Sequence, residues 1–309
     1  MAFFISGSET MTYCPIPAKV EYWNGYARWY RRWRTHNDYH GPIIEELKRR
    51  VRPGWRVLDI GAADGALAMP LSLWGCRVTA LEPAERLREC LVAEARRMGI
   101  PGPAVLEKTW EEYSDRNGEP YDLVLACNSL HLTAGGFRKS LAKIFALKPR
   151  RVLVVAEARA SGLFNLNQPG YILELVRSYE TDSHFAYHAL SEIPAHWEAC
   201  FGRRPGPEER RSLFQRLGYE EGHWWLKERA AVRIFYWTRG RCKTDKVHYE
   251  NKNEHSFQAF FVMPDSIRHP EHLKLDRPWI PAFAGMTTRW LTQYLHASRV
   301  PCGAWRFNT

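Results

Sequence analysis

The sequence predicts an α/β fold in which parallel strands alternate with helices. Three observations carry this prediction. A short apolar run at residues 56–60 ends in a glycine turn that opens a helix. A second apolar run follows at 77–82, and further runs recur at 103–107, 121–127 and 150–157 with helical segments between most of them. This alternation is typical of a parallel sheet with right-handed crossovers.

Length and composition are those of a globular chain with a sizeable core. The 309 residues suit one large domain or two small ones, and 45% of them are apolar. The chain lacks the run of about 18 apolar residues that a transmembrane helix needs, and its start does not resemble a secretory leader. The seven cysteines are scattered without C-x-x-C spacing, which argues against disulfides and metal sites. We therefore expect a cytoplasmic protein without a metal.

The N-terminal segment is expected to form two helices. Aromatic residues recur at three- and four-residue spacing within residues 20–50, the period of one helix face. A glycine–proline pair at 41–42 then opens a second helix that ends near Val51. We expect residues 1–40 to form a helical lid segment on a domain that spans residues 41–240.

The first strand is followed by a turn that suits a nucleotide, and two cofactors compete for it. A dinucleotide site needs the spacing G-x-G-x-x-G, but only Gly61 fits, because Ala63 and Ala66 occupy the other two positions. A methyl side chain there obstructs the approach of a pyrophosphate, which the carboxylate of Asp59 would also repel. Asp59 can instead accept a hydrogen bond from an ammonium group. With Glu82 at the end of the second strand, the pattern favours S-adenosylmethionine.

Together these residues resemble the first motif of the class I S-adenosylmethionine-dependent methyltransferases. Asp59, Gly61 and Gly65 match that motif, and Glu82 matches the acid that accepts from both ribose hydroxyls. Ala63 departs from it, since the family often carries glycine there. The resemblance covers about residues 40–240 and implies S-adenosyl-L-methionine as cofactor. It also implies a Rossmann-like sandwich with a mostly parallel seven-stranded sheet whose last strand is antiparallel.

The resemblance implies further residues around the cofactor. It places the turn after the third strand beside the adenine, where Trp110 can stack on the base and Thr109 can meet the exocyclic amine. Packing of Trp110 as a core residue at a helix start is the alternative. The cofactor-binding residues that we expect are Asp59, Gly61, Ala62, Gly65, Glu82, Pro83, Thr109, Trp110, Asn128 and Tyr26.

Asn128 and His131 are the candidate catalytic residues. The family places a residue that faces cofactor and substrate at the exit of the fourth strand, where Asn128 stands. His131 can act as a general base near pH 7 that takes a proton from a hydroxyl nucleophile, or it can cap the next helix. The exit lacks the N-P-P-Y pattern used to methylate exocyclic amines of bases, which counts against base methylation.

The aromatic and basic residues of the N-terminal helices each admit two roles. The aromatics either pack on the core or form a lid over the cationic sulfonium; they are Tyr22, Tyr26, Trp29, Tyr39 and His40. The basic residues either form a solvated face or attract an anionic substrate; they are Arg28, Arg31, Arg32 and Arg34. The net charge of +10 invites a nucleic-acid partner. We do not favour one, because no RNA-binding module is recognisable.

Beyond the fifth strand the regular alternation ends. Residues 160–204 are rich in aromatics, His, Pro and Gly and contain no clear strand, so we expect a substrate-side insertion there. A helix over 207–216 precedes two β-like runs at 222–226 and 231–238, which predict a closing hairpin. Residues 241–309 resemble peptides translated from dispersed palindromic repeats in bacterial genomes. They are expected to form a disordered or accessory tail, with a small partner-binding module as the alternative.

Three histidines in the expected insertion admit a metal site. His184 and His188 are four residues apart, so they would share one face of a helix, and His196 lies farther along. No acidic or cysteine partner has suitable spacing, which favours a role in lining the substrate pocket.

The patterns favour methyl transfer from S-adenosylmethionine to a small-molecule acceptor. Two other classes stay open. One is a methyltransferase acting on RNA or protein, which the basic cluster suggests, and the other is a non-catalytic partner protein that binds the cofactor. The acceptor, the methylated atom and the oligomeric state do not follow from the sequence.

Overall fold

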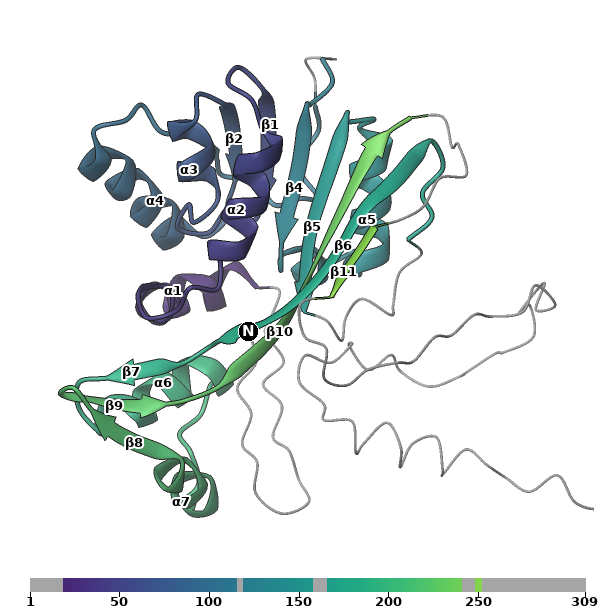
Figure 1. Ribbon diagram of the computed structural model, residues 1–309. Helices are drawn as coiled ribbons and strands as arrows, with labels where there is room; N and C mark the ends of the chain where they lie inside the picture. Colours follow the sequence, from purple (N-terminus) through teal and green to yellow (C-terminus); the bar gives the residue numbers. More distant parts are fainter. Residues whose placement is uncertain (1–18, 116–118, 158–165, 241–247, 252–309) are drawn as a thin grey trace, which may run out of the picture.

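The computed structural model describes residues 19–115, 119–157 and 166–240 and a strand at 248–251 (Figure 1). The strands of its main sheet are β1 (Arg56–Ile60), β2 (Arg77–Leu81), β3 (Ala104–Leu106), β4 (Leu123–Cys127), β5 (Arg151–Glu157), β6 (Tyr171–Asp182), β10 (Arg229–Arg239) and β11 (His248–Asn251). They lie in the order β11-β6-β10-β5-β4-β1-β2-β3. β1 to β5 run parallel to one another, whereas β10 is antiparallel to its neighbours β5 and β6.

The predicted fold class is confirmed. The sheet is mostly parallel, and the antiparallel strand β10 lies beside β5, as the resemblance implies. β11 adds an eighth strand by pairing parallel with β6. This strand falls within residues 241–309, the predicted tail, and the remainder of that stretch lies outside the described residues.

Two predictions about the second half of the chain are wrong. Residues 160–204 do contain strand structure: β6 belongs to the main sheet, where it pairs antiparallel with β10. The runs at 222–226 and 231–238 do not form a hairpin with each other: the first belongs to a separate small sheet, while β10 pairs with β5 and β6. The apolar pattern of β6 is interrupted by Glu174, Arg177 and Glu180, so its strand character depends on a partner far along the chain.

Helices cover both faces of the main sheet. They are α1 (Val20–Thr35), α2 (Gly41–Arg50), α3 (Ala68–Leu73), α4 (Glu85–Met98) and α5 (Gly136–Ala146), with a short 3-10 turn, η1, at Leu130–Leu132. Val57 packs with α1 to α4 in one core cluster, and its neighbour Leu58 packs with α5 in the other. Both side chains are fully buried. This burial on two faces explains why β1 is a continuous apolar run.

An insertion unit, residues 183–228, lies between β6 and β10. It contains a three-stranded antiparallel sheet and two helices, whose bounds are β7 (Phe185–Tyr187), α6 (Glu192–Phe201), α7 (Pro207–Gln215), β8 (Leu217–Glu220) and β9 (His223–Leu226). Figure 1 shows it carried below the main sheet on the long ends of β6 and β10.

The first helix joins the insertion unit to the main sheet. Figure 1 shows α1 between the two, and it contacts α4 on one side and α6 and β7 on the other. Its aromatic stripe is largely buried, with Tyr26, Trp29 and Trp33 each 3% exposed. None of the helices within the described ranges is long and apolar enough to cross a membrane.

Candidate functional site

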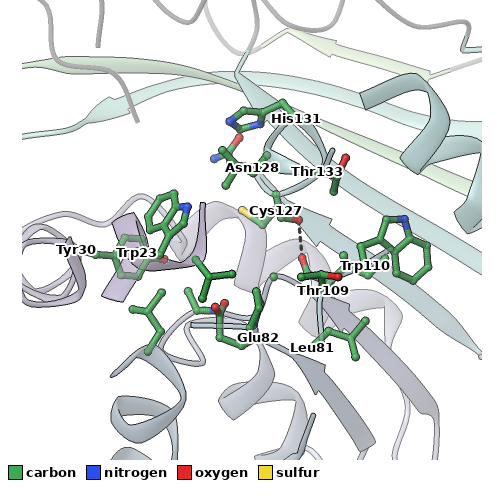
Figure 2. Close-up of a pocket in the computed structure, with 18 of the residues that line it drawn as sticks. Trp23, Tyr30, Leu81, Glu82, Thr109, Trp110, Cys127, Asn128, His131 and Thr133 are labelled. Carbon is green, nitrogen blue, oxygen red and sulfur yellow. Dashed lines mark hydrogen bonds between the residues drawn. The ribbon is translucent and has the colours of Figure 1, made fainter. Parts of the chain in front are cut away.

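A cavity of about 510 Å³ lies at the carboxyl ends of β1, β2 and β4, the edge at which parallel α/β sheets bind ligands. The loop after β1, the end of β2, the turn after β3, the exit of β4 and α1 all contribute to its walls. Figure 2 shows Glu82 and Leu81 at one end, Asn128 and His131 at the other, and Cys127 between them.

The loop after β1 is shaped by three residues with positive φ. Gly61 (φ +72°) packs so closely on Ser129 that an added Cβ would lie 2.5 Å from the Ser129 Cβ. Gly65 (φ +87°) lies against Met69 and Leu91 in the same way. Ala63 is also left-handed, with φ +50°. The departure from the family motif therefore falls at a position where glycine would relieve strain.

Glu82 is a buried carboxylate that faces the cavity. It is 5% exposed and lines the wall at the end of β2. Its Oε2 accepts from the backbone N–H of Ala63 and its Oε1 from that of Ala84, both at 2.8 Å. Burial raises the pKa of Glu82 to about 7, although the two N–H donors oppose the rise. Each oxygen keeps a lone pair that can accept one further hydrogen bond.

Asp59 lies behind the cavity wall without a partner. It is 2% exposed and does not line the cavity, although its neighbours Ile60 and Gly61 do. Its carboxylate makes no hydrogen bond or ion pair within the part of the chain that the structure describes. Burial, together with the nearby Glu82, raises the pKa of Asp59 to about 8. A cation beside this carboxylate would favour its ionised form.

Three more of the predicted cofactor residues are placed in or near the same wall. Pro83 lines the cavity next to Glu82, whereas Ala62 and Gly65 do not line it. The backbone N–H of Ala62 donates to Leu81 O at 2.9 Å. Ala62 and Gly65 therefore fix the course of the loop.

The turn after β3 brings Thr109 and Trp110 to the cavity wall. The Thr109 hydroxyl donates to the Glu112 carboxylate at 2.9 Å and accepts from the Glu112 backbone N–H at 3.3 Å, which leaves one lone pair of its oxygen for a ligand. Trp110 is 4% exposed, and its Nε1 donates to Ser140 O at 3.2 Å. Its indole also stacks on Tyr113. Trp110 is thus held by the core and contributes to the wall from a fixed position.

The exit of β4 places the two candidate catalytic residues at the far end of the cavity. Asn128 has φ +49°, and its Nδ2 donates to the hydroxyl of Tyr39. Its Oδ1 is left to accept from a ligand. His131, in η1, lines the cavity and reaches solvent, but the surrounding protein removes hydration from its imidazole and lowers its pKa to about 4. The imidazole is therefore uncharged at neutral pH and able to accept a proton. Both positions agree with a role at the reacting end.

An aromatic wall, formed by Trp23, Tyr30, Trp33 and Tyr39, runs along one side of the cavity. Successive ring centroids lie 6.3, 5.8 and 5.2 Å apart. Tyr26, which we predicted to contact the cofactor, does not line the cavity: its hydroxyl hydrogen-bonds with His196 Nε2 at 3.1 Å. The helical period of α1 turns Tyr26 toward the insertion unit and leaves the cavity to other rings of the stripe.

Two arginines of the basic cluster attach α1 to its neighbours. Arg34 Nε donates to Oδ2 of the buried Asp64 at 2.6 Å, which fastens the end of α1 to the loop after β1. Arg32 reaches Glu192 of the insertion unit at 2.7 Å. We expected these arginines to be either solvated or free for a substrate. Their ion pairs with Asp64 and Glu192 are formed with residues distant in the sequence, so they become visible only in the three-dimensional structure.

The histidines that suggested a metal do not converge. His184 and His188 flank the strand β7, so they do not share a helix face. His196 is 1% exposed and lies between the hydroxyls of Tyr26 and Tyr187. Among the described residues, no group of three or more His, Cys, Asp or Glu side chains is arranged to hold a metal ion.

Sequence reasoning missed the residues that close the cavity from the insertion side. Ser183, Glu228 and Ala231 line it from the ends of β6 and β10. Nothing in their local sequence marks them, because the contact depends on how β6 and β10 extend past the main sheet. The aromatic spacing of α1, in contrast, was a signal for Trp33.

Comparisons with known proteins add little to this geometry. No family model matches the sequence, and no curated protein matches it. Among solved structures, the magnesium protoporphyrin IX methyltransferase from Synechocystis PCC 6803 with bound SAM is similar over 71% of this chain and 94% of that one, with 14% identity and a TM-score of 0.45. An rRNA methylase from Streptococcus thermophilus is similar over 65% and 95%, with 11% identity and a TM-score of 0.39. Values this low carry neither activity nor substrate to this chain.

Proposed function

We propose that the chain is an S-adenosylmethionine-dependent methyltransferase with a small-molecule acceptor. Glu82 carries the proposal. Its carboxylate is buried at the end of β2, is oriented by two backbone N–H groups, and keeps one accepting lone pair on each oxygen toward the cavity. Two neighbouring acceptors on a fixed carboxylate match the two hydroxyls of a ribose.

The remaining parts of the site fit the same cofactor. Asp59 supplies a buried carboxyl group that has no hydrogen bond or ion pair among the described residues. An ammonium group beside it would favour its ionised form, whereas a pyrophosphate would oppose it. The Thr109 oxygen and Trp110 line the part of the cavity that would hold the adenine, on the opposite side from α1 (Figure 2). When bound, the cofactor supplies a methyl group on a positively charged sulfur, which is a good leaving group.

The protein itself would then exclude water, orient the acceptor and accept a proton. The aromatic wall and the insertion unit exclude water from the cavity, which strengthens its polar interactions. Asn128 orients the acceptor through its side-chain carboxamide, which keeps one N–H beyond its bond to Tyr39. His131 receives the proton of a hydroxyl nucleophile on its imidazole and passes it to solvent, to which it is exposed.

A small molecule is favoured over RNA as acceptor because the basic cluster has other partners. Arg34 and Arg32 are engaged in ion pairs with Asp64 and Glu192. The guanidinium of Arg28 lies over the ring of Trp29, 4.5 Å from its centroid. Two of the four arginines therefore hold α1 in place, and Arg28 lies on a ring of its own helix. This leaves a weak electrostatic footprint for a phosphate backbone.

Calorimetric titration with S-adenosylmethionine tests the proposal. We expect saturable binding by the wild type and loss of binding in Asp59→Ala. Asp182→Ala, a change at an exposed carboxylate of β6, is the matched control and should bind as the wild type does. Absence of binding by the wild type at millimolar cofactor would defeat the proposal. Binding without turnover on any acceptor pool would instead support a non-catalytic partner protein.

A further inference from the structure

The cavity extends from the Glu82 end past the expected cofactor position. We call this farther part the acceptor chamber and define it by Trp33, Tyr39, Asn128, Ser183 and Ala231, all of which line the cavity. An inference about its occupant rests on the proposed function, because the cofactor must fill the Glu82 end for the chamber to become a separate compartment.

Direct contacts make these walls one continuous surface. Trp33 Nε1 donates to Ser183 Oγ at 3.0 Å, which joins α1 to the end of β6. The Ser183 N–H donates to Glu228 O at 2.9 Å, which joins β6 to the segment before β10. On the opposite side, Asn128 donates to the hydroxyl of Tyr39. The chamber is therefore framed by aromatic rings and neutral polar groups.

Two charged side chains beside the chamber, those of Glu228 and Arg229, already have partners of opposite charge within the protein. Glu228 pairs with Arg216 of the insertion unit. Arg229 is largely exposed and lies 3.5 Å from Glu180. His40, which also lines the cavity, is uncharged at neutral pH because burial and the nearby Arg34 lower its pKa to about 3. A charged ligand group entering the chamber would lose its hydration without gaining a free counter-charge from these residues.

We propose that the methyl acceptor is an uncharged aromatic hydroxyl compound. Its ring packs on Trp33 and Tyr39, the last two members of the aromatic wall, whose centroids are 5.2 Å apart. Its hydroxyl donates to the imidazole of His131, and its oxygen accepts from the second N–H of the Asn128 carboxamide, whose other N–H donates to Tyr39. The hydroxyl oxygen forms a bond to the methyl carbon as the carbon–sulfur bond breaks, and that electron pair stays on sulfur. The hydroxyl proton passes to the imidazole of His131.

Three matched probes test the charge preference. 4-Methylphenol, 4-hydroxybenzoate and tyramine share a phenol ring and differ in charge at neutral pH. We expect 4-methylphenol to bind the full chain, saturated with S-adenosylhomocysteine, at least about tenfold more tightly than either charged probe. The affinities are measured by ligand-observed NMR. Equal or tighter binding of a charged probe would overturn the proposal.

The test separates this inference from the proposed function. If S-adenosylhomocysteine does not bind, the methyltransferase proposal fails. If it binds and 4-methylphenol does not, only the acceptor inference fails.

Changes at Ala231 locate the probe in the chamber. Ala231→Arg should give 4-hydroxybenzoate at least about a tenfold gain in affinity, and Ala231→Leu should weaken 4-methylphenol by filling the space. Both variants should keep the wild-type affinity for S-adenosylhomocysteine, which also reports that they fold. Glu198→Arg, at an exposed site on α6, is the control and should leave the preference unchanged. Unaltered probe binding in both Ala231 variants would show that the probe lies elsewhere.

Discussion

The two ends of the cavity are built in different ways. The ribose-facing part of the cofactor end comes from one short stretch, residues 59–82, in which a strand, a turn, a helix and a second strand bring Ala63 to Glu82. The acceptor end is assembled from remote segments: Trp33 and Ser183 are 150 positions apart, and Tyr39 and Asn128 are 89 apart. The first can be inferred from local spacing, whereas the second depends on tertiary structure.

This difference separates the donor from the acceptor of the proposed reaction. The loop after β1 has a fixed backbone shape, because three of its residues adopt positive φ. We therefore expect it to accept one kind of cofactor. The acceptor end can change whenever the insertion unit or the turn after α1 changes, without altering the loop. The helix α1 couples the two ends, because its aromatic wall extends from Trp23 to Tyr39 along both.

Removing one carboxylate at the cofactor end should have the largest effect. Glu82→Gln keeps the size of the side chain but replaces an anionic acceptor pair with one acceptor and one donor. We expect S-adenosylmethionine affinity to fall about 100-fold, or about 3 kcal/mol, in calorimetric titration. Glu85→Gln, a change in the first turn of α4, should bind normally. An unchanged affinity in Glu82→Gln would place the ribose elsewhere and break the contrast between the two ends.

Removing the ion pair between Arg34 and Asp64, which joins α1 to the loop after β1, should have the second-largest effect. Arg34→Ala removes the partner of Asp64, which is 1% exposed and has one oxygen, Oδ1, already without a hydrogen bond. We expect the free energy of unfolding to fall by about 2 kcal/mol, measured by urea denaturation. Arg31→Ala, at an exposed position on the same helix, should change it by less than about 0.5 kcal/mol. Equal losses in both variants would mean that the ion pair contributes no specific stability.

The buried carboxylates of the cofactor end should make stability depend on pH. The folded pKa values of Asp59 (about 8) and Glu82 (about 7) lie above their ordinary values. Between pH 5 and pH 8 the folded chain therefore holds more protons than the unfolded chain. The free energy of unfolding should fall as pH rises through that range, by about 1.4 kcal/mol per pH unit for each carboxyl group that is protonated only in the folded chain.

Denaturant titrations at several pH values measure this slope, and Asp59→Asn should flatten it. The cofactor should counteract it, because a bound cation favours the ionised Asp59. Its affinity is accordingly expected to rise between pH 6 and pH 7.5. A pH-independent stability in the wild type would contradict the burial of these carboxylates.

The smallest effect should come from the departure from the family motif. Ala63→Gly removes the backbone strain of an alanine with positive φ, which stabilises the folded chain. It also raises the conformational entropy of the unfolded chain, and the two contributions to the free energy of unfolding nearly cancel. We expect a change in the free energy of unfolding of less than about 1 kcal/mol and undiminished cofactor affinity. Gly61→Ala is the contrasting variant, since its Cβ would meet Ser129 at 2.5 Å. A large loss in Ala63→Gly would show that the methyl group of Ala63 is needed.

The cofactor end could be predicted from sequence because its signals are local. The apolar runs of β1 and β2, the positive-φ positions and the acid at the end of β2 all lie within one βαβ unit. Exit residues such as Asn128 and His131 could be located because the first four residues of β4 are buried, so that the strand forms a clear apolar run.

The insertion side could not be predicted, for two physical reasons. β6 is an irregular strand whose charged side chains disrupt the period of two, so it is recognisable only through its pairing with β10. The orientation of the N-terminal aromatics depends on which neighbours α1 meets: the same stripe buries Tyr26 against His196 and presents Trp33 to the cavity. Spacing predicts that such a face is buried, but it does not distinguish core from cavity.

A crystal structure of the chain with S-adenosylhomocysteine would test the central claim most directly. We predict both ribose hydroxyls within hydrogen-bonding distance of Glu82, the adenine beside Thr109 and Trp110, and the homocysteine ammonium group nearest to Asp59. The acceptor chamber should stay open beside Asn128. A ligand bound elsewhere, or a ribose that leaves Glu82 bonded only to the backbone of Ala63 and Ala84, would contradict the account.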